Sequence, residues 1–223
     1  MRKVIAIDGP SGVGKGTLCQ KLARELGWAY LDSGALYRLA ALYMAQCGLE
    51  EADASVQAEA LSRMPFAFVP SECGMDVVLG GNVVNRELRL ETTGEAASKL
   101  AAKPEIRAAL LDVQRHFAGD KPLIADGRDM GTVVFPNAPA KFFLTASPEV
   151  RAERRYKQLL AQGECVNLRS LSNEIAARDA RDSSRSVAPL KPASDAVVID
   201  TGTMSIDEVA ASVQARLAVI FDF

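Results

Sequence analysis

The feature that most constrains this chain is a glycine-rich loop between a short apolar run and a helical pattern near the N-terminus. Residues 4–7 are Val-Ile-Ala-Ile and predict a buried strand. Residues 8–17 follow as Asp-Gly-Pro-Ser-Gly-Val-Gly-Lys-Gly-Thr, and Leu18, Leu22 and Leu26 then recur one helical turn apart. In such a strand–loop–helix unit, backbone N–H groups, the positive end of the helix and a lysine face one concave space. The pattern therefore predicts a phosphate cradle.

The spacing of this loop agrees with the pattern of a P-loop. Four residues separate Gly9 from Gly14, and Lys15 follows directly. The usual pattern continues with serine or threonine, whereas this chain has Gly16 before Thr17. Gly-Lys-Gly-Thr is typical of nucleoside monophosphate kinases, and the flanking strand and helix argue against a chance glycine-rich turn. We therefore predict that the whole loop binds the phosphates of ATP, through Gly9, Pro10, Ser11, Gly12, Val13, Gly14, Lys15, Gly16 and Thr17.

The composition sets limits on size, partners and location. With 223 residues, of which 48% are hydrophobic, the chain can bury a core as one domain with an insertion or as two small domains. With a net charge of −2, the chain lacks the excess of basic residues that is typical of nucleic-acid-binding proteins, so we expect no nucleic-acid partner. No apolar run approaches the ~20 residues that span a bilayer. The N-terminal residues also lack the apolar core of a signal peptide, so we expect a cytoplasmic protein without a membrane partner.

The cysteines and the histidine argue against some classes of chemistry. Cys19, Cys47, Cys73 and Cys165 are widely separated and form no Cys-x-x-Cys pair, so we expect reduced thiols that serve mainly as core residues. The one histidine, His116, lies on a predicted helix. A mechanism that needs a histidine base or a histidine-rich metal site is therefore not expected.

Beyond the loop, apolar runs of strand length alternate with helical patterns. The runs are residues 28–31, 123–126, 141–145 and 196–200. The helical patterns are residues 35–47, 54–63, 92–117 with a break at Pro104, and 168–180, with two more that begin at Ser147 and at Ser205, the latter in a capping box with Glu208. Five buried strands alternating with helices predict an α/β fold, with a P-loop NTPase-type parallel sheet flanked by helices. Ligands should gather at the carboxyl ends of its strands.

One stretch departs from this alternation. Three short β-prone runs occupy residues 66–69, 76–79 and 82–85. Gly80 and Gly81 favour a tight hairpin between the last two runs. We predict a small antiparallel β insertion at residues 65–91, with a helical return to about residue 117, inside a single P-loop kinase domain that spans residues 1–223.

Phosphoryl transfer requires that donor phosphates be held, a magnesium ion be placed and cations surround the migrating group. Lys15 supplies one cation in the predicted loop. Asp126 ends an apolar strand, in the position of an acid that orients Mg²⁺ through water, and Thr17 offers a hydroxyl to the ion or to a phosphate. A turn or helix-cap aspartate is the alternative interpretation of Asp126.

Arginines form the second chemical signal. Arg178, Arg181, Asp182 and Arg185 share one face of a helix, at spacings of three and four residues. Such a face could simply carry solvated ion pairs, each worth little. In a chain with a P-loop, however, guanidinium groups suit the binding of two phosphorylated substrates, because each offers a fork of donors. The residues for which we predict catalytic roles are Lys15, Arg128, Arg178 and Arg181.

Four segments in order along the chain carry a combined signal. They are Gly-Pro-Ser-Gly-Val-Gly-Lys-Gly-Thr (9–17), Leu-Asp-Ser-Gly-Ala-Leu-Tyr-Arg (31–38), Asp-Gly-Arg-Asp-Met-Gly-Thr-Val-Val-Phe-Pro (126–136), and Arg-Asp-x-Arg-Asp-x-x-Arg (178–185) followed by Ala-Pro-Leu. Together they resemble the bacterial cytidylate kinases, and the resemblance runs from the first strand to the last helix. It implies direct in-line, Mg²⁺-dependent transfer of the γ-phosphoryl group of ATP to CMP or dCMP.

The resemblance also implies roles for individual residues. The positions that match residues contacting cytosine in that family are Ser33, Arg107, Asp129 and Arg185. Those that match contacts to the sugar are Ser98, Arg178 and Asp182, and those that match contacts to the acceptor phosphate are Arg38 and Arg128. A carboxylate such as that of Asp129 suits cytosine, because the base presents an exocyclic amine donor. Residues 65–91 correspond to the family's nucleoside monophosphate-binding part, and residues 151–167 to a short lid over ATP.

Other interpretations stay open at this point. Another small-molecule kinase, acting on AMP, UMP or a non-nucleotide such as shikimate, would share the loop and differ in its acceptor. A GTPase-like switch would usually carry Asn-Lys-x-Asp, which this chain lacks. A nucleic-acid-associated ATPase would be expected to interleave basic and aromatic residues. Since nothing in the sequence demands an oligomer, we expect a monomer.

Overall fold

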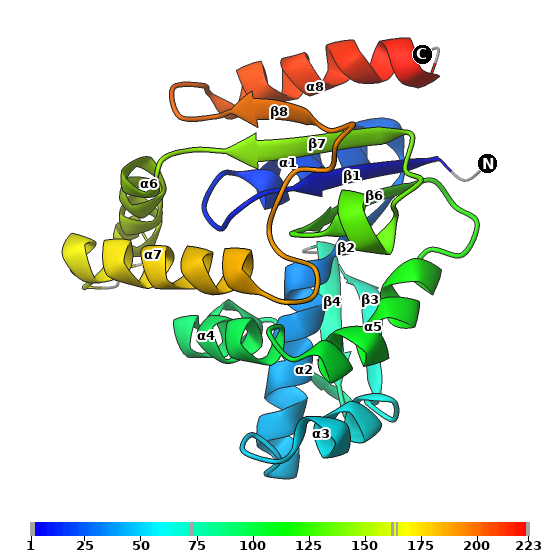
Figure 1. Cartoon of the computed structure of the whole chain (residues 1–223), viewed down its shortest axis with the longest axis vertical. Helices are drawn as coiled ribbons and strands as arrows, with labels where there is room; N and C mark the ends of the chain where they lie inside the picture. The colour runs from blue at the N-terminus through cyan, green and yellow to red at the C-terminus, as the bar shows by residue number, and fades with distance from the viewer. Residues whose placement is uncertain (1–2, 72–73, 162, 164, 222–223) are drawn as a thin grey trace. The chain divides into compact units, whose positions relative to one another are not determined.

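The computed structural model describes residues 3–71, 74–161, 163 and 165–221, so Cys73, one of the expected reduced thiols, lies outside the described residues. The chain divides into two compact units (Figure 1). Unit 1 comprises Met1–Asp32 and Phe117–Phe223, and unit 2 comprises Ser33–His116. Among the described residues, no helix has the length and apolar character needed to cross a membrane.

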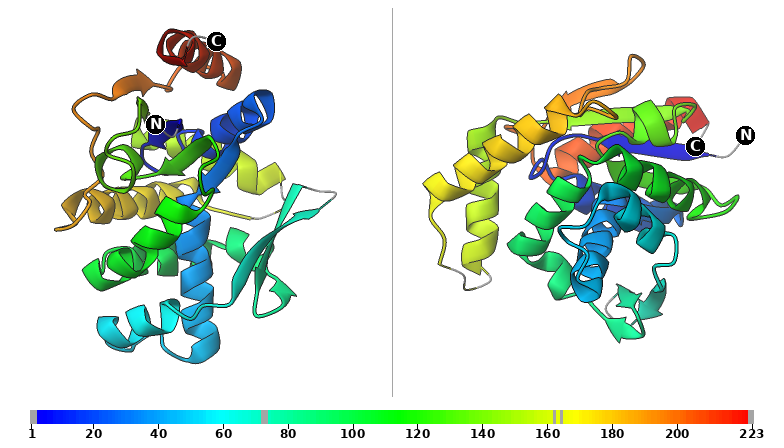
Figure 2. Two further views of the ribbon diagram at one scale, coloured as in Figure 1. Left: turned by 90° about the vertical axis from the view of Figure 1, so that its right-hand side faces the viewer. Right: turned by 60° about the horizontal axis from the view of Figure 1, so that its bottom comes forward.

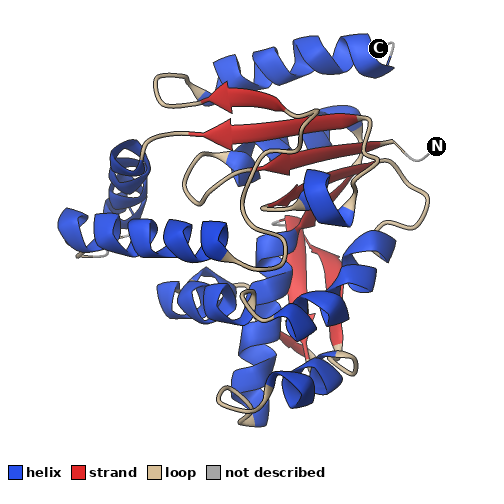
Figure 3. Ribbon diagram, in the orientation of Figure 1, coloured by secondary structure: helices blue, strands red, loops and turns tan. Residues whose placement is uncertain are grey.

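The centre of unit 1 is a five-stranded sheet in the order β2-β6-β1-β7-β8, shown by the larger group of red arrows in Figure 3. Its strands are β1 (Val4–Asp8), β2 (Ala29–Asp32), β6 (Leu123–Gly127), β7 (Ala140–Thr145) and β8 (Val197–Asp200). All neighbouring strands are parallel, which confirms the predicted fold class. The strand before the glycine-rich loop is therefore the middle strand of the sheet.

Helices flank this sheet, as predicted. They are α1 (Lys15–Leu26), α6 (Pro148–Ala161), α7 (Leu168–Ser184) and α8 (Ile206–Phe221). Ile5 and Ile7 of β1 share a buried cluster with Leu18 and Leu22 of α1 and with Val213 of α8, so α1 and α8 cover one face of the sheet. The helices α6 and α7 pack against each other, and the right panel of Figure 2 shows them next to each other.

Two predicted helix ends in unit 1 can be compared with the structure: the capping box at Ser205 and the helix end at residue 180. The capping box is confirmed, because the Ser205 hydroxyl accepts from the Glu208 N–H at 3.2 Å and the Ser205 N–H donates to the Glu208 carboxylate at 2.7 Å. The predicted end of a helix at residue 180 is wrong, since α7 continues to Ser184. Arg185 donates to Asp182, three residues earlier, and this side-chain pair supports the last turn of the helix.

Unit 2 contains the predicted antiparallel insertion together with helices on both sides of it in the chain. Its elements are α2 (Ser33–Cys47), α3 (Ala54–Leu61), β3 (Phe66–Ser71), β4 (Gly74–Leu79), β5 (Asn82–Val83), the 3-10 turn η1 (Glu87–Arg89), α4 (Glu91–Leu100) and α5 (Pro104–His116). The strands pair in the order β3-β4-β5. The hairpin between β4 and β5 turns at Gly80 and Gly81, whose φ angles of +57° and +85° explain the two glycines.

Two local predictions in unit 2 need correction. The run at 82–85 is not a strand throughout, because β5 ends at Val83 and the Asn85 side chain then accepts from the Val77 N–H at 2.8 Å. The helix predicted from residue 35 begins at Ser33, whose hydroxyl donates to the side-chain oxygen of Gln114 at 2.7 Å. The contact of Ser33 joins residues 81 positions apart and leaves no local pattern, whereas that of Asn85 crosses the β4–β5 hairpin.

Candidate active site

The glycine-rich loop between β1 and α1 takes a path that demands glycine. Gly9, Gly12 and Gly14 have φ angles of +148°, +82° and +93°. A Cβ atom on Gly9 would lie 2.2 Å from the carbonyl oxygen of Leu144, so the loop packs directly against the backbone of β7. Gly14 is the N-cap of α1 and has no side chain to accept from the first N–H groups of the helix. These N–H groups are therefore available to an anion.

We expect Gly9→Ala to destabilise the protein by about 3 kcal/mol or more, because the added methyl group meets backbone atoms that cannot move aside. The midpoint of urea unfolding would measure the loss. Gly27→Ala is the matched control, since Gly27 is also left-handed, with a φ of +66°, but has nothing within 4 Å of the added Cβ. Its expected cost is about 1 kcal/mol. Equal losses in the two variants would contradict the steric explanation.

A lysine and an aspartate face each other at the mouth of the loop. Lys15 is buried, and its Nζ atom donates to the Pro10 carbonyl oxygen at 2.8 Å and lies 3.9 Å from Oδ1 of Asp126. The hydroxyl of Tyr30 donates to Oδ2 of the same aspartate at 3.4 Å. The parallel pairing of β1 with β6 accounts for this meeting, because it aligns Ile7 with Asp126 and so brings both strand ends to one edge.

Burial dominates the electrostatics of this pair. It lowers the pKa of Lys15, and the nearby Arg128 guanidinium lowers that pKa further. It also raises the pKa of Asp126, although the ammonium group of Lys15 opposes the rise. Both groups are thus poorly solvated in the absence of a ligand. A phosphate beside the lysine, or a cation beside the aspartate, would favour the charged form of each.

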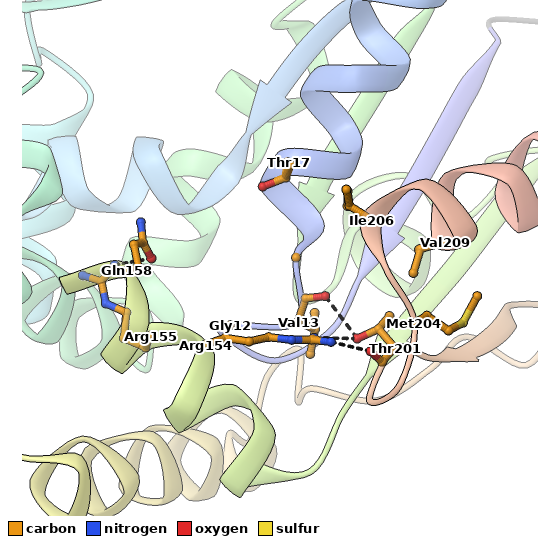
Figure 4. A pocket seen from close by; sticks show the side chains of 11 residues that line it. Gly12, Val13, Thr17, Arg154, Arg155, Gln158, Thr201, Met204, Ile206 and Val209 are labelled. Atoms are coloured by element: carbon orange, nitrogen blue, oxygen red, sulfur yellow. Dashed lines mark hydrogen bonds between the residues drawn. The ribbon is translucent and has the colours of Figure 1, made fainter. Parts of the chain in front are cut away.

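A cavity of about 330 Å³ opens beside the loop in unit 1 (Figure 4). Its walls come from the loop and the start of α1, from α6, and from the segment that joins β8 to α8 together with the start of α8. Arg154 of α6 donates to the carbonyl and hydroxyl oxygens of Thr201 at 2.5 and 3.1 Å, and these bonds hold its guanidinium group at the wall. Met204 and Ile206 supply apolar surface. A flat cation and apolar side chains together suit a nucleobase.

Arginines from two segments converge on Asp182, near the end of α7. Arg128 donates through Nε to one carboxylate oxygen at 2.9 Å, and Arg185 donates to the other. Burial alone would raise the pKa of Asp182, but the two guanidinium groups outweigh it and hold that pKa below its ordinary value, with a smaller contribution from Arg178. The structure thus brings together Arg128, Arg178, Asp182 and Arg185. Arg181 precedes Asp182 on the same helix.

Asp129 is buried at the start of a five-residue π-helical turn, η2 (Met130–Val134). Its carbonyl oxygen accepts from the N–H groups of Val133 and Val134 at 2.9 and 3.1 Å. Asp129 therefore sits between Arg128, which points to α7, and a turn that packs on β1.

Two buried residues near the loop were missed by the sequence analysis. Asp8 accepts from the N–H groups of Met130 and Gly131, both at 2.8 Å, and burial raises its pKa to about 6. Arg151 of α6 donates to the Ser11 carbonyl oxygen at 3.2 Å and forms a two-point ion pair with Asp179 of α7. An acid at the end of an apolar strand was a visible signal for Asp8, as it was for Asp126. The contacts of Arg151 join residues far apart in the chain and leave no periodic pattern.

The other predicted acceptor residues lie in unit 2. Arg38 of α2 donates to the Leu88 carbonyl oxygen at 2.6 Å, and Gly94 of α4 leaves room for it, since a Cβ there would lie 3.0 Å from the guanidinium group. Ser98 is buried on α4. Arg107 of α5 is also buried, and its guanidinium carbon lies 5.5 Å from the ring centre of Tyr37. Ser33 begins α2 and contacts Gln114, as described above.

A P-loop on the middle strand, with its lysine close to a buried acid at the end of the neighbouring strand, defines a P-loop nucleoside triphosphate-binding protein. Comparison with known proteins narrows this class. The family model described as "Cytidylate kinase" matches residues 5–218, and the chain belongs to the cytidylate kinase family.

Named relatives agree with the family over nearly the whole chain. A cytidylate kinase of Dichelobacter nodosus is 62% identical over 215 residues, which cover 96% of each chain. A cytidylate kinase of Pseudomonas putida (strain W619) is 51% identical over 217 residues, 96% of this chain and 95% of that one. In fold alone, the chain is similar to a crystal structure of an uncharacterized protein from Eubacterium ventriosum, with a TM-score of 0.51 and 12% identity over 98% of this chain and 99% of that one.

Proposed function

We propose that this chain transfers the γ-phosphoryl group of ATP to CMP or dCMP, which yields ADP and CDP or dCDP. The observation that carries this proposal is the match to the cytidylate kinase family over residues 5–218. This range includes the glycine-rich loop and the segments 126–136 and 178–185, which carry Arg128 and Arg185. The named relatives share this name at 50% identity or more. Direct transfer needs no strong base, because the acceptor phosphate is already ionised at neutral pH.

On the donor side, the loop and Lys15 bind the phosphates of ATP, and the cavity beside the loop takes its nucleoside. Arg154 stacks on the base, because Thr201 already engages its edge donors. Residues 151–167 act as a lid over the donor. Closure of such a segment excludes water and so prevents wasteful hydrolysis of ATP.

The residues at the mouth of the loop fit a magnesium ion. Mg²⁺ is usually held by one or two protein oxygens together with substrate phosphates and water. The carboxylate of Asp126 and the hydroxyl of Thr17, which lines the cavity, match that small set of hard oxygen ligands. When bound with ATP, the ion would neutralise charge on the β and γ phosphates.

The catalytic cations are Lys15, Arg128, Arg178 and Arg181. Arg128 contacts the acceptor phosphate, and its bond to Asp182 orients its guanidinium plane. Placed cations of this kind lower the barrier because charge spreads over the transferred oxygens in the transition state.

The acceptor is recognised through its base, sugar and phosphate. Asp129 accepts from the exocyclic amine of cytosine, which uracil lacks. The other proposed acceptor residues are Ser33, Arg38, Ser98, Arg107, Arg178, Asp182 and Arg185. We also propose that residues 65–91 form part of the acceptor-binding region and that the chain acts as a monomer.

The test is release of ADP from MgATP in a coupled assay, with CMP, dCMP, UMP, AMP, GMP and shikimate offered in parallel. We expect rapid turnover with CMP and dCMP and little with AMP, GMP or shikimate. Turnover with a different acceptor only would keep the P-loop chemistry and discard the assigned base contacts. A chain without acceptor-dependent turnover would not be a kinase for these substrates.

A further inference from the structure

The carboxylate of Asp8 joins the end of β1 to the start of η2. Its two oxygens accept from two successive backbone N–H groups, those of Met130 and Gly131, each at 2.8 Å. Asp8 is only 3% exposed, so water does not compete for these bonds. Alternate residues of a strand face opposite sides. Because Ile7 packs under α1 and α8, Asp8 faces the side of the sheet on which η2 lies.

The turn that Asp8 holds is tightly fitted on both sides. A Cβ on Gly131 would lie 3.2 Å from Cδ of Lys141 and 3.4 Å from Oδ2 of Asp8. A Cβ on Gly127 would lie 2.7 Å from the terminal carbon of Met130. The backbone of η2 therefore has little freedom to shift while the carboxylate bonds are made. If one of them is lost, a buried N–H group is left without its acceptor, which favours displacement of the turn.

The position of this turn matters because Arg128 and Asp129 come directly before it. Asp8 is also followed directly by Gly9, the first glycine of the phosphate-binding loop, which is itself seated against Leu144. One carboxylate thus connects the donor loop to the segment that carries two proposed acceptor contacts.

We propose that Asp8 is a positioning residue for acceptor recognition: by holding η2, it sets the place of Asp129 against the cytosine base and of Arg128 against the acceptor phosphate. This inference rests on the proposed function. Asp8 itself touches no substrate in this scheme, so its loss should change selectivity for the base rather than only the amount of folded enzyme.

The test is Asp8→Asn, which keeps the size of the side chain but turns an amide donor toward one of the two N–H groups. We expect kcat/KM for CMP to fall about 10²-fold, as a shift of about 1 Å at a reacting centre can cause. The preference for CMP over UMP, as a ratio of kcat/KM values, should fall about tenfold, while KM for ATP changes less than about threefold.

The control is Val213→Ala, which removes volume from the core cluster under α8. Compared at equal fractions of folded protein, it should keep the wild-type ratio of CMP to UMP. Asp8→Asn with a wild-type ratio would overturn the proposal, and so would a loss confined to ATP binding. If Asp8→Asn does not fold, Asp8→Glu keeps the charge but lengthens the buried side chain by one methylene, so it pushes against the same turn, and an unchanged ratio there would equally overturn the proposal. If the wild-type enzyme itself does not prefer CMP, the proposed function fails instead.

Discussion

Arg128→Ala should lower kcat with CMP by about 10³-fold or more, the scale on which arginines that contact a transferred phosphoryl group act. The protein should still fold. Arg128 is one of two guanidinium groups on the buried Asp182, and Arg185 remains after the substitution. The loss of stability should therefore stay below the roughly 3–5 kcal/mol that an uncompensated buried charge costs. Steady-state kinetics and urea unfolding of the same preparation would measure both quantities.

Two further variants isolate the role of Arg128. Arg24→Ala removes an exposed arginine from the last turn of α1 and should leave kcat unchanged. Arg128→Lys keeps the charge but loses the planar fork, so we expect it to recover only part of the rate. Near-normal turnover by Arg128→Ala would show that this residue does not bind the acceptor phosphate.

Lys15→Met should lower kcat by about 10²–10³-fold, because it removes a preorganised charge from the phosphate cradle while nearly preserving side-chain length. Lys15 is buried, and its amine bonds to Pro10 and faces Asp126. Without the ammonium group, the pKa of Asp126 should rise further, since Lys15 is the main cation opposing the effect of burial. The affinity for ATP, measured by calorimetry with and without Mg²⁺, should weaken together with the rate.

The matched control for this substitution is Lys21, which lies further along the same helix, α1. Lys21 is partly exposed and pairs with Asp207 at 2.8 Å, so Lys21→Met removes the same charge without touching the loop. It should keep wild-type turnover. If the two variants lost activity equally, the effect would come from the charge of α1 as a whole and not from the cradle.

Local patterns were enough for the main features of the fold. The apolar run 4–7 and the glycine spacing after it identified β1 and the loop, because a buried strand and a phosphate-binding turn each need a particular residue type at each step. The alternation of strands and helices then predicted a parallel sheet, and the structure confirms that neighbouring strands are parallel. The strand order β2-β6-β1-β7-β8 comes from the structure alone. The capping box at Ser205 was equally local.

Boundaries set by distant contacts were not predictable in this way. The helix predicted from residue 35 begins at Ser33, whose hydroxyl donates to the side-chain oxygen of Gln114. Asn85 lies beyond the end of β5, and its side-chain oxygen, not its backbone, accepts from the Val77 N–H group. A propensity rule weighs a residue against its neighbours in sequence, whereas Gln114 lies 81 positions from Ser33 and becomes its neighbour only in the folded chain.

The sequence by itself determined the class of chemistry, since a phosphate cradle and its lysine are contiguous in the chain and carry their meaning in residue type and spacing. The segments 126–136 and 178–185, which carry Arg128 and Arg185, were likewise recognisable from the sequence, through the resemblance to a family. Only the tertiary structure decided which groups act together: that Arg128 and Arg185 share Asp182, that Lys15 faces Asp126, and that Asp8 holds the turn after Asp129. The physical reason is that burial and strand register create these pairs, and both arise from packing that no single segment encodes.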